Sequence, residues 1–297
     1  MKLKLPSRKR ALRWLVIGIV TLIIGVYLLL PIGFGIVVVF PYKESVGDPP
    51  EGFETISLKT ADHVTLAAWY RPPANGAAII LIHGAGGSRE SMRGYADMLV
   101  QEGYGVLALD LRGHGTSKGG TNRLGWQGTR DVSAAVEFLL TQEDVKTIGA
   151  LGSSLGGEVL LGAASEVPAL QAIIADGATH RCLDELRALP KERPLVRNFV
   201  PRVMYATVQV LSGDEPPKPL LDSMIEADST VFMLIAAGKN DQEIDYNELF
   251  AEKLGDRASL WIAPGVSHTG AFKQYRDEYQ QRVIAFFDAA LLNEDEG

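Results

Sequence analysis

The chain has 297 residues, of which 46% are hydrophobic and 22% are charged, and its net charge at pH 7 is −7. This composition is that of a globular protein and excludes a disordered or collagen-like chain. Because Cys182 is the only cysteine, the chain forms no internal disulfide and no cysteine cluster for a metal. We interpret Cys182 as a small structural residue.

The first forty residues differ from the rest of the chain. Residues 14–40 carry no charge, and six basic residues without an acidic one precede them: Lys2, Lys4, Arg8, Lys9, Arg10 and Arg13. At about 1.5 Å per residue, an apolar helix of this length crosses a hydrocarbon core of about 30 Å. We expect Pro31 to kink or end the helix, with residues 32–40 continuing it or lying at the membrane interface.

This pattern predicts an uncleaved transmembrane anchor at about residues 14–40, within an N-terminal segment of residues 1–47. A cleavable signal peptide is the alternative, but the apolar run is long for one and no A-x-A cleavage site follows it. Because basic flanks stay in the cytoplasm, the pattern indicates a single-pass protein of the cell membrane whose main domain lies outside the cytoplasm. Without the six basic residues the net charge is about −13, which disfavours nucleic acid and anionic lipid headgroups as partners.

After a short linker at residues 46–52, the remaining chain suits one α/β domain at residues 48–297. Apolar runs typical of strands occur at residues 65–70, 78–82, 105–109, 147–151, 170–175, 231–236 and 259–262. Helical patterns alternate with them at residues 89–101, 130–141, 158–164 and 275–292. This alternation predicts a mainly parallel sheet with helices on both faces, in which sites form at the carboxyl ends of the strands.

One long insertion breaks the alternation. About 55 residues separate two of the expected strands, and residues 181–189 and 195–211 within them have helical patterns punctuated by prolines. We interpret the insertion, at about residues 181–226, as a helical lid over the site. The alternative is helical packing without a gating role, because an apolar stripe such as that of residues 195–211 belongs to a core more often than it lines an acyl pocket or faces lipid.

The segment Gly152-Ser153-Ser154-Leu155-Gly156 follows an expected strand and opens an expected helix. A sharp turn of this kind exposes the central serine, and the helix N-terminus directs backbone N–H groups at negative charge. Ser154 is therefore the candidate nucleophile. The alternative is a glycine-rich helix start without catalytic function.

A serine hydroxyl needs a base, and the base needs an orienting carboxylate. Of the five histidines, His268 lies in a loop just after the last expected strand, where the base belongs in the chain order Ser, acid, His. We choose Asp241, in the loop after the strand at residues 231–236, as the acid. Glu243 is its immediate neighbour, and Asp176 at the preceding strand end is the alternative.

The negative oxygen of the reaction intermediate needs backbone donors. The N–H of Leu155, which follows the nucleophile, is the first, and the N–H of Ala85 in the glycine-rich loop at residues 83–88 is the second. A phosphate-binding loop is the competing interpretation of this segment. It lacks both the G-x-x-x-x-G-K-[ST] and the G-x-G-x-x-G spacing, so we set it aside.

Four segments in this order resemble the α/β-hydrolase superfamily: residues 83–87, 110–117, 152–156 and 238–241. The likeness extends from about residue 55 to the C-terminus, and the short first loop resembles the serine aminopeptidase-like and lipase-like esterase groups. The resemblance implies the α/β-hydrolase fold, with Ser154 as nucleophile, Asp241 as acid and His268 as base. In the family, residues 110–117 form a structural turn, and we interpret His114 in this way. The serine argues against the dehalogenase and dienelactone branches, which use aspartate and cysteine.

The sequence thus predicts a membrane-anchored serine hydrolase that cleaves a small-molecule or lipid-like carboxylic ester through an acyl-enzyme, without a cofactor or a metal. A peptidase or thioesterase with the same three residues is one alternative. A non-catalytic binding protein on a hydrolase scaffold is the other, and an intact Ser, Asp and His argue against it.

Overall fold

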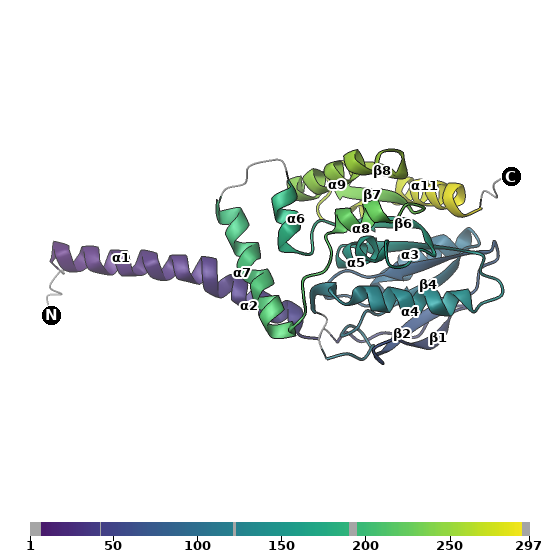
Figure 1. Ribbon diagram of the computed structural model, residues 1–297, viewed down its shortest axis with the longest axis horizontal. Helices are drawn as coiled ribbons and strands as arrows, with labels where there is room; N and C mark the ends of the chain where they lie inside the picture. The colour runs from purple at the N-terminus through teal and green to yellow at the C-terminus, as the bar shows by residue number, and fades with distance from the viewer. Residues whose placement is uncertain (1–6, 42, 121–122, 190–194, 293–297) are drawn as a thin grey trace.

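An eight-stranded sheet forms the centre of the protein in a computed structural model that describes residues 7–41, 43–120, 123–189 and 195–292 (Figure 1). The strands are β1 (Glu54–Lys59), β2 (Thr65–Arg71), β3 (Ala77–Ile82), β4 (Gly105–Leu109), β5 (Thr147–Ser153), β6 (Leu170–Asp176), β7 (Val231–Ala237) and β8 (Ala258–Ala263). Their order in the sheet is β1-β2-β4-β3-β5-β6-β7-β8. The β1–β2 and β2–β4 pairs are antiparallel, and all pairs from β4 to β8 are parallel.

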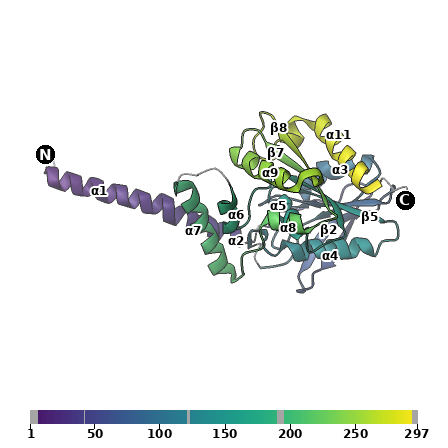
Figure 2. The same cartoon turned by 45° about the horizontal axis from the view of Figure 1, so that its top comes forward.

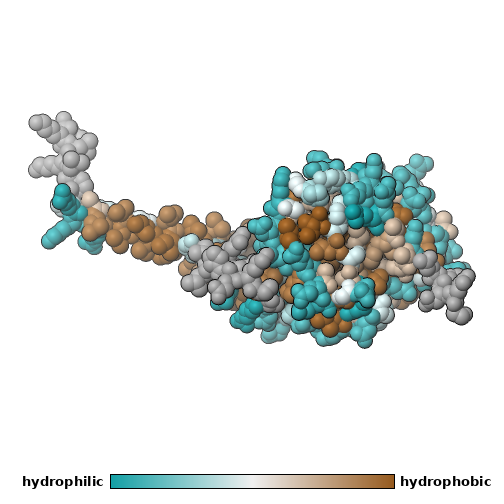
Figure 3. All heavy atoms as spheres, turned by 90° about the horizontal axis from the view of Figure 1, so that it is seen from above, coloured by the Kyte–Doolittle hydropathy of each residue, from teal (hydrophilic) through white to brown (hydrophobic). Residues whose placement is uncertain are grey.

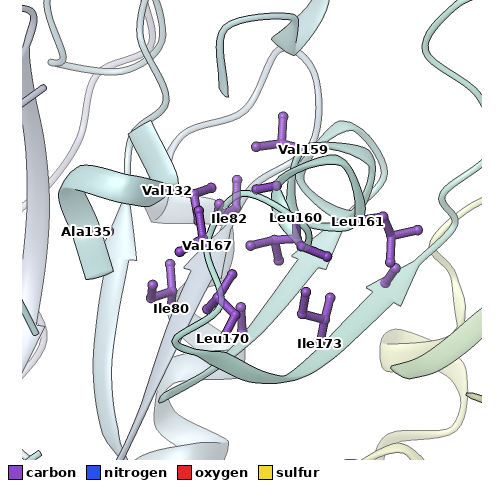
Figure 4. Packing of buried hydrophobic residues seen from close by; sticks show 14 of the residues in the cluster. Ile80, Ile82, Val132, Ala135, Val159, Leu160, Leu161, Val167, Leu170 and Ile173 are labelled. Carbon is purple, nitrogen blue, oxygen red and sulfur yellow. The ribbon is translucent and has the colours of Figure 1, made fainter. Parts of the chain in front are cut away.

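Helices cover both faces of the sheet, which confirms the expected α/β class. They are α3 (Arg93–Gln101), α4 (Gly128–Leu140), α5 (Leu155–Ala163), α6 (Leu183–Ala188), α7 (Leu195–Ser212), α8 (Leu220–Glu226), α9 (Asp241–Leu254), α10 (Ala271–Gln274) and α11 (Arg276–Phe287). One apolar core joins the sheet to α4, α5, α8 and α9, and a second joins it to α3 and α11. In the first core, Ile80 and Ile82 of β3 pack near Val159 and Leu160 of α5 (Figure 4). All six residues of β3 are buried, as a strand covered on both faces requires.

Short 3-10 helices lie at Arg89–Met92, Arg123–Gly125 and Gly255–Arg257, and π-helical turns lie at Gly25–Leu29 and Asp288–Leu292. The strand β1 and the helices α8 and α9 lie where the sequence analysis expected no regular element. The expected insertion at residues 181–226 contains α6, α7 and α8, and its residues 190–194 lie outside the described residues, as do Lys2 and Lys4 of the basic cluster.

The N-terminal segment forms a helical stalk that extends away from the sheet domain in two views (Figures 1 and 2). It consists of α1 (Arg8–Ile24), the π-helical turn and α2 (Leu30–Val39), and together these 32 residues are long and apolar enough to cross a membrane. No residue of α1 is buried, and its apolar side chains form a hydrophobic surface outside the domain (Figure 3). Pro31 does not end the helix: it lies in the first turn of α2, directly after the π-helical turn, where the irregular bonding accommodates the missing N–H.

The last turns of the stalk pack on α7. A Cβ atom built on Gly35 would lie 2.8 Å from the Thr207 Cβ atom, so the two helices approach more closely than a larger residue would permit. Beside this contact, a third apolar cluster contains Val39, Trp126, Leu186, Tyr205 and Val208. The end of the stalk is therefore attached to the insertion through buried apolar contacts.

Candidate active site

Ser154 lies in the turn between β5 and α5 with φ 52° and ψ −118°. A positive φ is unfavourable for a residue with a side chain, and such strain persists only where the surroundings impose it. Here the Ser154 N–H donates a 2.7 Å hydrogen bond to the Asp176 carbonyl oxygen at the end of β6. The turn therefore holds the serine at the carboxyl end of the sheet.

Two glycines permit this turn. A Cβ atom built on Gly152 would lie 2.3 Å from the Gly156 carbonyl carbon, and one built on Gly156 would lie 2.3 Å from the Ile82 carbonyl oxygen. Both contacts are with backbone atoms, which have no side-chain rotamer that relieves the clash. The start of α5 therefore sits directly against β3 and β5, as the glycine pattern of the sequence indicated.

The structure brings His268 to Ser154. His268 follows β8, and its Nε2 atom lies 2.8 Å from the Ser154 Oγ atom. Its Nδ1 atom lies 2.6 Å from Oε1 of Glu243. Hydroxyl, imidazole and carboxylate thus form one chain of hydrogen bonds, the arrangement by which a histidine removes the proton of a serine.

The carboxylate in this chain is not Asp241. Asp241 is the first residue of α9 and is exposed, whereas Glu243 is fully buried two residues later. The Asn240 side chain caps the helix by accepting the N–H groups of Gln242 and Glu243 at 3.2 and 3.4 Å. Because the helix begins here, residue 243 turns inward, and its Oε2 atom accepts the Ala237 N–H at 2.8 Å. The choice of Asp241 as the partner of His268 is therefore corrected to Glu243.

The hydrogen bond that His268 donates to the Glu243 carboxylate raises the pKa of His268 above its ordinary value of 6.5, against the opposing effect of burial. Asp176, the alternative acid of the sequence analysis, adds a smaller charge effect in the same direction. Its own carboxylate accepts the Tyr279 hydroxyl at 3.1 Å, and burial raises the pKa of Asp176 to about 7. Asp176 thus lies at the turn that holds Ser154, whereas the carboxylate that contacts His268 is that of Glu243.

The loop after β3 passes beside Ser154. A Cβ atom on Gly84 would lie 3.4 Å from the Ser154 Cβ atom, and the next residue, Ala85, lines the same cavity as Leu155. His83 anchors this loop, because its Nε2 atom accepts the Leu111 N–H at 3.2 Å while its Nδ1–H donates to the Gly84 carbonyl oxygen at 2.8 Å. Burial lowers the pKa of His83 to about 4, so this histidine stays neutral and holds the loop in place.

His114 and Cys182 have surroundings typical of structural residues. The His114 ring lies 4.8 Å from that of His83, and burial lowers the pKa of His114 to about 4. Cys182 is buried at the start of α6, and burial raises the pKa of its thiol to about 12. A thiol is nucleophilic as the thiolate, so this shift agrees with a structural interpretation of Cys182.

Comparison with known proteins identifies the class. Residues 77–223 match the family described as the alpha/beta hydrolase fold. The esterase Pf2001 of Pyrococcus furiosus is 23% identical and superposes with a TM-score of 0.68, covering 86% of this chain and 98% of its own. The chain belongs to the α/β-hydrolase superfamily, and its fold is the α/β-hydrolase fold.

Two curated relatives are similar in sequence. The uncharacterized protein YfhR of Salmonella typhi is 25% identical over 265 residues, which cover 85% of this chain and 87% of YfhR. An uncharacterized protein of Mycobacterium tuberculosis is 29% identical over 215 residues, which cover 66% of this chain and 75% of the relative.

Proposed function

We propose that this protein is a serine hydrolase that cleaves carboxylic esters through an acyl-enzyme on Ser154. The observation that carries the proposal is the chain of hydrogen bonds from Ser154 Oγ to His268 Nε2 at 2.8 Å and from His268 Nδ1 to Glu243 Oε1 at 2.6 Å. The superfamily is one of hydrolases, and a structural neighbour with the same fold is an esterase, which favours an ester over other acyl substrates.

In this mechanism the Ser154 Oγ atom attacks the ester carbonyl carbon while His268 accepts the hydroxyl proton. Glu243, buried and hydrogen-bonded to Nδ1, stabilises the imidazolium that forms. The N–H groups of Leu155 and Ala85 stabilise the negative oxygen, and His268 returns the proton to the leaving alkoxide. Water then attacks the acyl-enzyme with the same general base and releases the acid.

The test uses the full-length protein in detergent micelles and a fluorophosphonate probe, which reacts with an activated serine. We expect one probe per chain, with the adduct on Ser154 and not on the adjacent Ser153 when the labelled peptide is fragmented by mass spectrometry. Prior incubation with a hydrolysable ester should slow labelling. An unlabelled protein, or an adduct at another residue, would overturn the assignment of the nucleophile.

A peptidase or thioesterase would use the same residues, and the choice of substrate separates these classes. Matched ester, thioester and anilide derivatives of one acyl group should be compared as substrates of the unlabelled enzyme. We expect the ester to have the highest kcat/KM, and an anilide or a thioester with a clearly higher value would replace the esterase proposal.

We further propose that the stalk anchors the protein in a membrane. A helix of 32 residues is about 48 Å long, which exceeds a hydrocarbon core of about 30 Å. The excess is close to the length of α2, the part that packs on the domain. Arg8, Lys9, Arg10 and Arg13 lie at the opposite end, which favours a cytoplasmic N-terminus.

Protease protection tests this orientation in cells whose outer wall has been removed and whose cell membrane is intact. Added protease should digest a C-terminal epitope tag and leave an N-terminal tag intact until the membrane is permeabilised. The reverse pattern would contradict the orientation. Release of the protein by high salt or carbonate would contradict the anchor itself.

A further inference from the structure

A cavity of about 490 Å³ lies between the end of the stalk and the loops around Ser154. Six of its lining residues belong to the end of the stalk or directly follow it, and all are apolar: Phe34, Ile36, Val37 and Val38 of α2, then Phe40 and Pro41. The others, which include Ala85 and Leu155, are also apolar. The volume lies in the range of a site for one small-molecule ligand, and the lining favours a hydrocarbon group.

Two lining residues of the cavity adjoin the reaction centre of the proposed mechanism. Leu155 follows Ser154 directly, and Ala85 follows the glycine that lies against Ser154. These two residues supply the N–H groups proposed to bind the carbonyl oxygen of the substrate. A carbonyl group bound by these N–H groups would lie next to the cavity, within reach of one of its two substituents.

The stalk side of the cavity is held in place by packing. Gly35 contacts Thr207 of α7, and Val39 is buried in the cluster with Tyr205 and Val208. Residues beside these anchors leave much of their apolar surface accessible: Phe34 is 55% exposed and Val37 is 69% exposed. A fixed set of exposed apolar side chains next to a nucleophile is a binding surface for an apolar group.

The same helix continues into α1, whose apolar side chains are exposed along its length (Figure 3). The surface that would contact the acyl chains of a bilayer is thus continuous with one wall of the cavity. An apolar chain moving from the membrane along the stalk contacts apolar side chains as far as the cavity, so the hydrophobic cost of extracting it is reduced.

We infer that this cavity binds the acyl chain of a membrane-lipid ester, and that α2 is part of the substrate site rather than only a tether. This inference rests on the proposed serine hydrolase activity. The acyl carbonyl carbon forms a bond with Ser154 Oγ, the ester C–O bond breaks, and the alcohol leaves with the proton carried by His268. Water then cleaves the acyl-enzyme, which yields the fatty acid and free Ser154.

The test measures chain-length selectivity on the full-length protein in detergent micelles, with p-nitrophenyl esters from acetate to dodecanoate. The readout is the ratio of kcat/KM for the dodecanoate ester to that for the acetate ester. For the unaltered protein, each methylene group buried in the cavity should raise kcat/KM about fourfold until the cavity is full. A flat profile would overturn the inference.

Two variants change the cavity in opposite directions. Val37→Trp fills it and should lower the ratio at least about tenfold, whereas Phe34→Ala enlarges it and should shift the preferred ester to a longer chain. Val20→Trp places the same substitution in α1, away from the cavity, and Phe199→Ala removes the same side chain from α7. Both controls should keep the ratio of the unaltered protein.

Fluorophosphonate labelling of Ser154 reports whether each variant retains a folded site. A ratio for Val37→Trp equal to that of the unaltered protein, with both esters hydrolysed, would overturn the acyl cavity and leave the proposed hydrolase intact. An equal loss of kcat/KM for both esters would also overturn it, if Ser154 of Val37→Trp still reacts fully with the probe in a separate sample. Failure of the unaltered protein to hydrolyse any ester would overturn the proposed function as well.

Discussion

Replacement of Ser154 by alanine is expected to lower kcat for a carboxylic ester by about 10⁶-fold and to abolish fluorophosphonate labelling. Without the hydroxyl, no acyl-enzyme forms, and only the backbone N–H groups and substrate binding remain to stabilise attack by water. The His268–Glu243 hydrogen bond does not depend on Ser154, so the loss reports the nucleophile itself. Initial rates of the full-length variant in micelles measure it.

Ser153→Ala is the matched control. Ser153 is the last residue of β5, directly before the nucleophile, and it is half-buried. Removing its hydroxyl leaves the hydrogen-bond chain in place, so we expect kcat within about threefold of the unaltered protein. More than a few per cent of the rate remaining in Ser154→Ala, or a loss in Ser153→Ala comparable to it, would contradict the assignment.

The sequence predicted the parts of this site that depend on backbone shape. The five-residue motif around Ser154 needs glycine where a Cβ atom would meet backbone, and those positions are occupied by Gly152 and Gly156. The positions of the central strands along the chain likewise follow from apolar runs that only a covered sheet can bury, such as the fully buried β3. His268 was found because strand-end loops of a parallel sheet converge on one edge.

The carboxylate was misassigned because the start of α9 was not recognised. This helix is rich in acidic residues, and its buried aromatic residues, Tyr246 and Phe250, are few. In a loop, Asp241 and Glu243 are equivalent candidates, whereas at a helix start they point to different sides. Asn240 followed three residues later by a glutamate is a helix N-terminus signature, and this signal would have favoured Glu243.

The sequence pattern also could not predict where α2 packs on the domain. Composition and length predicted an apolar helix of the right size, and both were visible in residues 14–40. Packing of Gly35 against Thr207 joins segments far apart in the chain, and no local pattern encodes which surface a small residue contacts. The proximity of the stalk to Ser154, and with it the acyl cavity, follows only from the three-dimensional structure.

Glu243→Gln is expected to lower kcat by about 10³- to 10⁴-fold at neutral pH. Glutamine keeps the size of the side chain but carries no negative charge to stabilise the imidazolium that forms when His268 takes the serine proton. Asp241→Asn makes the same chemical change at the exposed start of α9 and should keep kcat within about twofold. A larger loss in Asp241→Asn than in Glu243→Gln would restore the assignment made from the sequence alone.

The pH dependence separates this role from a merely structural one. His268 acts as a base only when neutral, so kcat/KM should rise with pH through the pKa of His268 in the free enzyme. Because the hydrogen bond to Glu243 raises this pKa, the midpoint for the unaltered protein should lie above 6.5. In Glu243→Gln the protonated imidazole loses its anionic partner, and the midpoint should move to lower pH. A variant that loses activity with an unchanged midpoint would show that Glu243 maintains the fold of the loop and does not stabilise the charged histidine.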